Sequence, residues 1–194
     1  MNYPKYFDNI EHIILKDELS EFLGSTENGI INISYLEIVK MAGHSCAVVA
    51  GAYLMALKGL KALYGEEIPV RGEIKVELKG TLSDNTGVTL QVLSNITGAT
   101  VDTGFLGLPG GRFNRRNLIT LGADIPYTAR FTRIDTGKYV DVNYSPGKVV
   151  SPKEILMSAI GPHATPESKK SFPERWQKMV ETIFDNMDRV ITIK

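Results

Sequence analysis

The clearest pattern in the chain is a long apolar segment of helical character, from Ser45 to Tyr64. Small residues within it allow close packing on neighbouring elements, and its lysines occur only in the last two turns, where cations suit the negative end of a helix dipole. Ser45 is a suitable N-cap, and Gly65 is a stop signal. The nearly uncharged run 46–57 is too short to cross a membrane, so the pattern predicts a buried core helix and no membrane span.

Alternation of apolar and polar positions predicts strands elsewhere. In the segment 70–79, Ile74, Val76 and Leu78 alternate with charged residues, which is typical of a strand with one solvated face. The segments 128–134 and 138–144 alternate on either side of an Asp-Thr-Gly turn and indicate a hairpin. Further short strands are predicted at 29–35, 118–121 and 190–193.

Helical spacing predicts several further helices, at 17–23, 36–42, 88–97 and 152–160, and from Ser171 or Phe172 to about Met187. In the last of these, Pro173 would occupy the first turn, where proline is tolerated. Helices and mostly antiparallel strands are mixed rather than arranged as strict β-α-β repeats. The predicted fold class is therefore α+β, with a mixed or antiparallel sheet and packed helices.

Composition narrows the classes of protein. The 194 residues, 43% of them apolar, suit one domain with a full hydrophobic core. The 22 basic residues balance the 22 acidic ones, which argues against a general nucleic-acid binder. A single cysteine excludes an internal disulfide and fits a reducing compartment, and the first 11 residues lack the pattern of a signal peptide. We therefore expect a cytoplasmic protein.

The single cysteine and one of the three histidines lie together at the start of the long helix. His44 and Cys46 follow Gly43, which can supply a bend, and outside a regular helix this spacing lets an imidazole nitrogen and a thiolate bind one ion. Nitrogen and sulfur ligands favour zinc or a similar divalent transition metal. Alternatively, Cys46 is the nucleophile of a thiol enzyme with His44 as its base. In a purely structural interpretation Cys46 is a small buried hydrophobe.

A metal site needs ligands beyond this pair. The sequence offers His12, His163, Asp84 and Asp102 as candidates, and no local pattern selects among them. A site with two or three protein ligands and open positions would be catalytic or ligand-binding in type rather than structural.

A second candidate site is the irregular loop 104–116, which has four glycines and a proline within eight residues. Its Arg112, Arg115 and Arg116, together with exposed backbone amides, would suit a small anionic ligand such as a carboxylate or phosphate. The loop lacks the Gly-Lys-Ser/Thr of a P-loop and the following helix of a dinucleotide fingerprint. In the alternative interpretation, the arginines pair with acids on neighbouring strands.

Three segments within about 39–144 resemble the formylmethanofuran dehydrogenase E-subunit-like family. Gly43-His44-Ser45-Cys46, followed by a helix rich in small residues, is similar to the family's Gly-His-x-Cys-Pro-Gly segment. The segment 96–100 is similar to its Leu-Thr-Gly-Cys-Thr, and the hairpin 130–142 resembles its ending. The resemblance implies an α+β domain of the kind grouped with the second domain of glyceraldehyde-phosphate dehydrogenase, a metal site that is commonly zinc, and a homodimer.

The resemblance implies His44 and Cys46 as metal ligands. Ala42, Ala47 and Ala99 stand where the family has a histidine, a proline and a cysteine, so its fuller ligand set does not transfer. The related domain would span 1–150, with 151–194 as a helical extension packed on it in place of the family's frequent zinc ribbon. The leading interpretation is a cytoplasmic metal-binding protein in which the arginine loop binds an anion close to the metal. The alternatives are a thiol enzyme and a non-catalytic accessory subunit.

Overall fold

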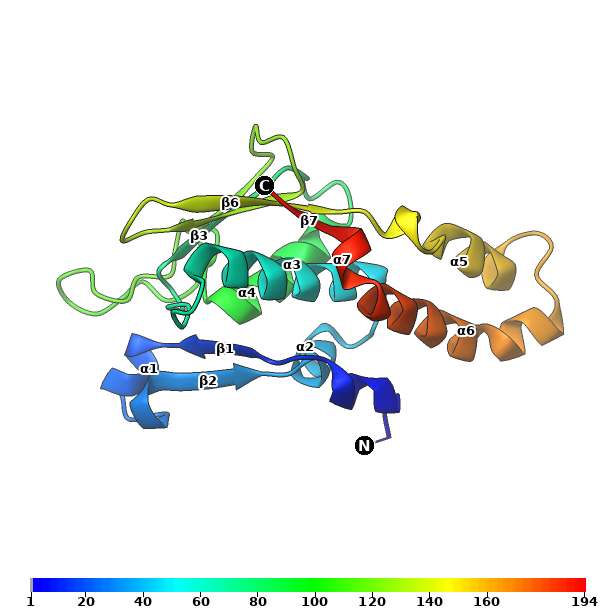
Figure 1. Cartoon of the computed structure of the whole chain (residues 1–194), viewed down its shortest axis with the longest axis horizontal. Helices are drawn as coiled ribbons and strands as arrows, with labels where there is room; N and C mark the ends of the chain where they lie inside the picture. Colours follow the sequence, from blue (N-terminus) through cyan, green and yellow to red (C-terminus); the bar gives the residue numbers. More distant parts are fainter. Residues whose placement is uncertain (1) are drawn as a thin grey trace.

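The computed structural model describes residues 2–194 and confirms the predicted α+β class, with helices packed on two sheets (Figure 1). The strands are β1 (Ile13–Lys16), β2 (Ile30–Ile33), β3 (Ile74–Leu78), β4 (Ile119–Leu121), β5 (Ala129–Arg133), β6 (Tyr139–Tyr144) and β7 (Ile191–Ile193). The α-helices are α1 (Glu18–Phe22), α2 (Tyr35–Ala42), α3 (Ala47–Tyr64), α4 (Thr86–Thr97), α5 (Pro152–Ile160), α6 (Pro166–Asp185) and α7 (Met187–Val190). Short 3-10 helices are η1 (Lys5–Asn9), η2 (Glu27–Gly29) and η3 (Pro146–Lys148).

The main sheet has five strands in the order β4-β3-β5-β6-β7. Strands β3 and β4 are parallel and are joined through α4, whereas every other neighbouring pair is antiparallel. The predicted alternation of β3 is confirmed, because Ile74, Val76 and Leu78 are all buried while Lys75 is exposed. The predicted hairpin is β5–β6, and the predicted last strand is β7 at the edge of the sheet.

The predicted core helix is α3, which lies between the five-stranded sheet and the β1–β2 ribbon (Figure 1). It approaches the sheet closely, since a Cβ atom on Gly51 would overlap the ring of Tyr144 in β6. Among the described residues, α3 is the one helix long and apolar enough to cross a membrane, and 78% of it is buried in the protein. A helix so enclosed by its own chain is a core helix.

The structure corrects the expected N-cap of α3. The cap is Cys46, because the Ser45 hydroxyl is engaged with the Tyr35 hydroxyl at 2.8 Å instead of capping the helix. The helix consequently starts at Ala47.

The structure also corrects the predicted start of α6 and adds a strand that the sequence pattern did not predict. Helix α6 begins at Pro166 rather than at 171 or 172, because Thr165 and Ser168 form a reciprocal capping box and Pro173 lies inside the helix. Strand β1 is not predicted by the sequence pattern, since its alternation covers only four residues before Asp17 caps α1. Its partner β2 lies in the segment predicted as a strand.

The C-terminal segment shares the core with the rest of the chain. The second half of α6 buries Met179, Val180, Ile183 and Phe184, and β7 extends the main sheet. The first half of α6 pairs with α5, and together they project from one end of the molecule (Figure 1). This projecting pair forms one wall of the candidate site.

Candidate functional site

His44 and Cys46 line the same cavity, which has a volume of about 380 Å³ and lies at the N-terminus of α3. Helices α3, α4, α5 and α6 all contribute to its walls. Its other polar side chains are Asn85 and Lys153, and its apolar lining is Ala47, Val48, Val88, Pro152, Leu156 and Trp176. The pairing of two chemically distinctive residues in one small, largely apolar hollow makes this the candidate site.

The bend between α2 and α3 exposes the imidazole of His44. Helix α2 ends at Ala42, and Gly43 adopts a left-handed conformation with φ of 77°, which glycine reaches without steric cost. The ring then folds back so that His44 Nδ1 lies 3.0 Å from the carbonyl oxygen of Ala42. A carbonyl oxygen can only accept, so Nδ1 carries a proton, and in the neutral form of the ring Nε2 is the electron-pair donor.

Cys46 is half-buried at the first position before α3. Its backbone is extended, with φ of −150°, and its Sγ accepts a weak hydrogen bond from the backbone N–H of Val49 at 3.5 Å. The sulfur therefore occupies the place that a capping oxygen takes in most helices. It is held at the helix terminus while it faces the cavity.

Ser45, which lies between His44 and Cys46, anchors this segment in the core. Its hydroxyl is paired with Tyr35, and its carbonyl oxygen accepts from Trp176 Nε1 at 3.0 Å and from Gln177 Nε2 at 3.4 Å. Burial raises the pKa of Tyr35 well above its usual value, so its hydroxyl stays protonated and able to bond. Buried Ser45 is thus fixed both by the preceding helix α2 and by α6, which is distant in sequence, and this orients His44 and Cys46 on either side of it.

The other candidate ligands do not line this cavity. His12 Nδ1 lies 2.9 Å from Asn32 Oδ1 and lines a different hollow beside β1. Asp84 Oδ1 accepts the backbone N–H of Thr86 at 2.6 Å, while His163 and Asp102 also lie outside the lining. Within residues 2–194 no three His, Cys, Asp or Glu side chains gather as a metal-binding group. His44 and Cys46 are the two metal-type donors that the described chain brings to the cavity.

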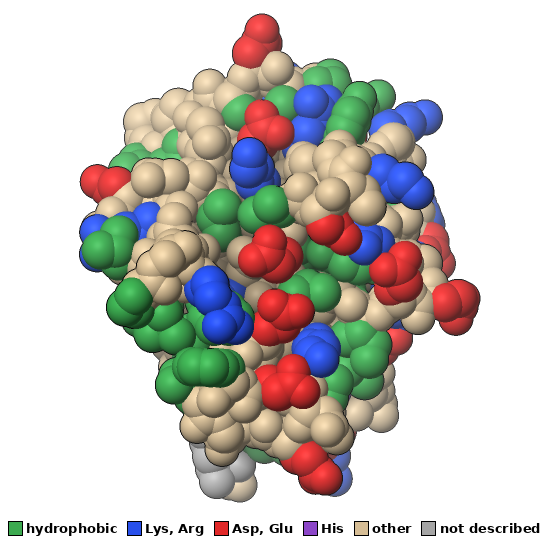
Figure 2. All heavy atoms as spheres, turned by 90° about the vertical axis from the view of Figure 1, so that its left-hand side faces the viewer, with side chains coloured by type: hydrophobic (Ala, Val, Ile, Leu, Met, Phe, Trp, Pro, Cys, Tyr) green, Lys and Arg blue, Asp and Glu red, His purple; other side chains and the backbone are tan. Residues whose placement is uncertain are grey.

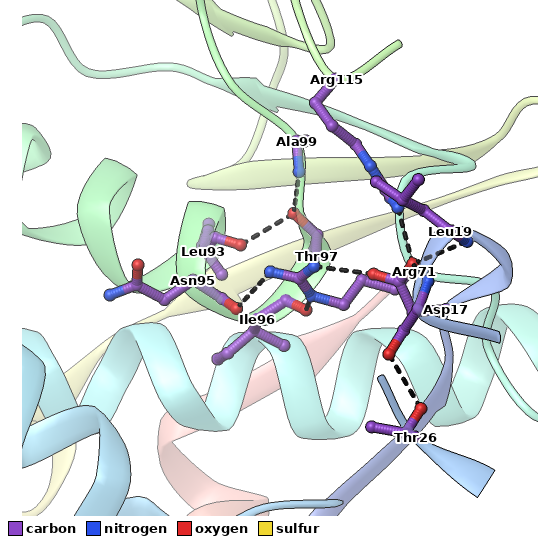
Figure 3. A network of polar contacts seen from close by, with 11 residues as sticks. Asp17, Leu19, Thr26, Arg71, Leu93, Asn95, Ile96, Thr97, Ala99 and Arg115 are labelled. Carbon is purple, nitrogen blue, oxygen red and sulfur yellow. Dashed lines mark hydrogen bonds and ion pairs between the residues drawn. The ribbon is translucent and has the colours of Figure 1, made fainter. Parts of the chain in front are cut away.

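Arg115 of the glycine-rich loop is part of a buried ion-pair cluster. Its Nη2 lies 2.8 Å from Asp17 Oδ1, and Arg71 Nη1 lies 2.8 Å from the other carboxylate oxygen (Figure 3). Burial lowers the pKa of Arg115, against the effect of the nearby Asp17 charge. For this residue the structure shows pairing with an acid, as in the alternative interpretation of the loop.

The other two loop arginines also have partners within the protein. Arg116 Nε donates to the carbonyl oxygen of Gly104 at 2.7 Å, and the Arg112 guanidinium lies over the rings of Phe22 and Phe113. Because Phe22 belongs to α1, this end of the molecule is remote from α5 in Figure 1. The predicted proximity of the arginine loop to the His44–Cys46 pair is therefore wrong. Figure 2 shows the same end with acidic and basic side chains interspersed.

The cation that the cavity does contain is Lys153, at the start of α5. Sequence reasoning missed it, because only the packing of α5 and α6 beside α3 brings residue 153 to residue 44. Comparison of the chain with protein-family models and with curated proteins gave no match. What the site can do therefore follows from its own atoms: one imidazole nitrogen, one thiol sulfur, one amide and one ammonium group around a small apolar hollow.

Proposed function

We propose that this chain is a cytoplasmic metal-binding protein that holds a zinc-like divalent ion through His44 and Cys46. The observation that carries the proposal is that both side chains line one cavity, on either side of a residue fixed in the core. The resemblance of the segment 43–46 to the formylmethanofuran dehydrogenase E-subunit-like family supports it from the sequence.

The residues present suit such an ion. Metal-binding histidines usually donate their second ring N–H to a carboxylate or backbone carbonyl, and His44 does so to Ala42. Imidazole nitrogen with thiolate sulfur is a donor pair that favours zinc and related metals. Two donors from the chain leave further coordination positions open to water or an exogenous ligand, which is the form of a ligand-binding site rather than a structural one.

The ligand that the cavity favours is small and anionic. Lys153 supplies the positive charge, while Trp176, Leu156 and Val88 form apolar walls. An ion held by His44 and Cys46 would polarise a carbonyl group or activate a water molecule. In this proposal Lys153 binds the anion, in place of the Arg112, Arg115 and Arg116 predicted from the sequence.

Metal content is the direct test. Cys46→Ser keeps a good helix cap but removes the soft donor, and His44→Gln keeps a polar side chain but removes Nε2. We expect each to lose the ion in elemental analysis and to lose the thiolate charge-transfer band after cobalt substitution. His12→Gln is the matched control, because it changes an exposed histidine outside the cavity. Equal metal content in all four proteins would refute the proposal.

The thiol-enzyme alternative predicts a different behaviour. It needs His44 as the base of Cys46, yet His44 Nδ1 is bonded to Ala42, and no hydrogen bond joins the two side chains in the described structure. If Cys46 is nevertheless the nucleophile, iodoacetamide should modify it well below pH 8, and His44→Gln should slow the modification.

Assembly is a separate part of the proposal. The family resemblance implies a homodimer, and light scattering of the purified chain should give twice the 21.4 kDa chain mass. An accessory subunit would instead be recovered in a stable complex with a larger partner. Metal analysis of that complex would show whether the His44–Cys46 site is filled there.

A further inference from the structure

A second and larger cavity, of about 590 Å³, lies beside the first. It is formed where β3 ends and α4 begins, with the segment 126–128 and Asn143 of β6 on its other side. In β-α-β units, ligands bind in crevices outside the carboxyl ends of the parallel strands, which is where this cavity lies between β3 and α4. Asn85 lines both cavities, so the two share a wall.

One hydroxyl that lines this cavity, on an otherwise buried threonine, has no protein partner. Thr89 of α4 is 8% exposed and lines the cavity, but nothing among residues 2–194 forms a hydrogen bond with its Oγ1. Threonines in helices commonly bond back to the carbonyl four residues earlier, and Thr97 of the same helix does so to Leu93 at 2.7 Å. The corresponding carbonyl for Thr89, that of Asn85, receives only backbone N–H groups. The Thr89 hydroxyl therefore remains available inside the cavity.

The charges of the cavity argue against an anion. The N-terminus of α4 would attract one, but the Asp84 carboxylate already accepts the Thr86 N–H there. Hydrogen bonds from Thr86 lower the pKa of Asp84, so the carboxylate is charged at neutral pH. Lys79 balances it from the other side, where its Nζ lies 3.4 Å from the carbonyl oxygen of Pro126. The remaining polar lining consists of hydroxyl and amide groups.

We propose that this cavity binds a neutral small molecule that carries hydroxyl or carboxamide groups, with Thr89, Asn85 and Asn143 as its hydrogen-bonding partners. Such groups both donate and accept, which matches a lining of hydroxyls and amides. The Thr128 hydroxyl donates to Asn143 Oδ1 at 3.0 Å and Asn143 Nδ2 donates to Ser145 Oγ at 2.9 Å, which holds the amide in place and leaves it one N–H and one oxygen lone pair for a ligand. Because Asn85 forms the shared wall, the bound molecule lies directly beside the cavity of His44 and Cys46.

The test is ligand-observed NMR on the full chain with ribose, myo-inositol, glucose and benzamide as neutral probes and inorganic phosphate as the anionic arm. We expect at least one neutral probe to bind at millimolar concentration. Thr89→Val keeps the shape but removes the hydroxyl and should weaken binding about fivefold, whereas Thr89→Ser should retain it. Thr97→Val is the matched control on the same helix, since its hydroxyl bonds within the protein.

Three outcomes would overturn the proposal. The first is a folded wild-type chain to which none of the neutral probes binds. The second is phosphate binding more tightly than every neutral probe, which would make the cavity an anion site. The third is unchanged probe affinity in Thr89→Val. Circular dichroism of each variant establishes that it is folded before binding is compared.

Discussion

Two polar clusters lie at different ends of the molecule, and each contains residues that the sequence marks as candidates, Arg115 in the first and His44 with Cys46 in the second. At one end, Asp17 joins Arg71 and Arg115 in a buried ion-pair cluster (Figure 3). At the other, His44 and Cys46 flank a cavity, each held by a single contact to the backbone. The first cluster uses its charges inside the protein, whereas the second keeps a ring nitrogen and a sulfur facing open space.

The difference shows which observation separates a structural cluster from a functional one. Arg115 has the residue type and loop setting of an anion site, but its guanidinium is buried against Asp17. The segment that carries His44 and Cys46 is anchored in the core, and both side chains line the cavity, although the Cys46 sulfur accepts one weak hydrogen bond from the Val49 N–H. Burial and partners decide the role here, and the residue types alone do not.

The largest effect is expected when the Asp17 carboxylate, which Arg71 and Arg115 share, is removed. Asp17→Asn keeps the size and capping capacity of the side chain but leaves two arginines around a neutral amide. We expect the free energy of unfolding to fall by about 3–5 kcal/mol, as when one partner of a buried ion pair is lost. Urea denaturation measures this free energy of unfolding. Glu21→Gln, which affects a half-exposed pair with Lys16, should cost less than about 1 kcal/mol.

If Asp17→Asn lowered the free energy of unfolding no more than Glu21→Gln does, the ion-pair cluster would not be structural. The loop 104–116 would then again be a candidate anion site. Metal content should be unchanged in Asp17→Asn, because Asp17 does not line the His44–Cys46 cavity.

Acid should weaken the same cluster. Burial acts to raise the pKa of Asp17, but hydrogen bonds from Arg71 and Ser20 and the charge of Arg115 outweigh it and leave the pKa below its usual 3.8. A depressed folded-state pKa stabilises the protein fully above the unfolded value, and this stabilisation is lost as the pH falls through the folded value. We expect the urea midpoint to decline below about pH 4, and to decline less steeply in Asp17→Asn. Parallel declines in the two proteins would assign the acid sensitivity to other carboxylates.

A smaller effect is expected at the scaffold of the metal pair. Ser45→Ala removes the partner of the buried Tyr35 hydroxyl, and an unsatisfied buried polar group costs about 1–3 kcal/mol. Metal affinity should also fall, since Ser45 fixes the segment that carries both donors. Ser83→Ala, at an exposed serine, is the matched control for stability. A loss of stability with fully retained metal affinity would show that the donors are positioned without Ser45.

The sequence predicted the parts of this molecule that depend on local pattern. Alternation located β3 and the β5–β6 hairpin, and a long apolar run located α3, because periodicity is set by which face is buried. It could not supply contacts between distant segments. Arg115 meets Asp17 across 98 residues, and Trp176 meets Ser45 across 131, and no local rule encodes either pairing. The candidate pair was found from the sequence, whereas its cavity, Lys153 and the Thr89 hydroxyl required the fold.

The smallest predicted effect tests how the C-terminal helix supports the site. Trp176→Phe removes the Nε1–H that donates to the Ser45 carbonyl, while Gln177 still donates to the same oxygen. The phenylalanine ring keeps an aromatic wall in the cavity. We expect a stability loss of about 0.5–1.5 kcal/mol, which is the usual net value of one hydrogen bond. Metal affinity should weaken less than in Ser45→Ala, because the Gln177 hydrogen bond and the Ser45–Tyr35 pair both remain and no buried hydroxyl loses its partner. A Trp176→Phe protein that lost the metal completely would instead place the indole ring itself among the groups that hold the bound ion and its ligand.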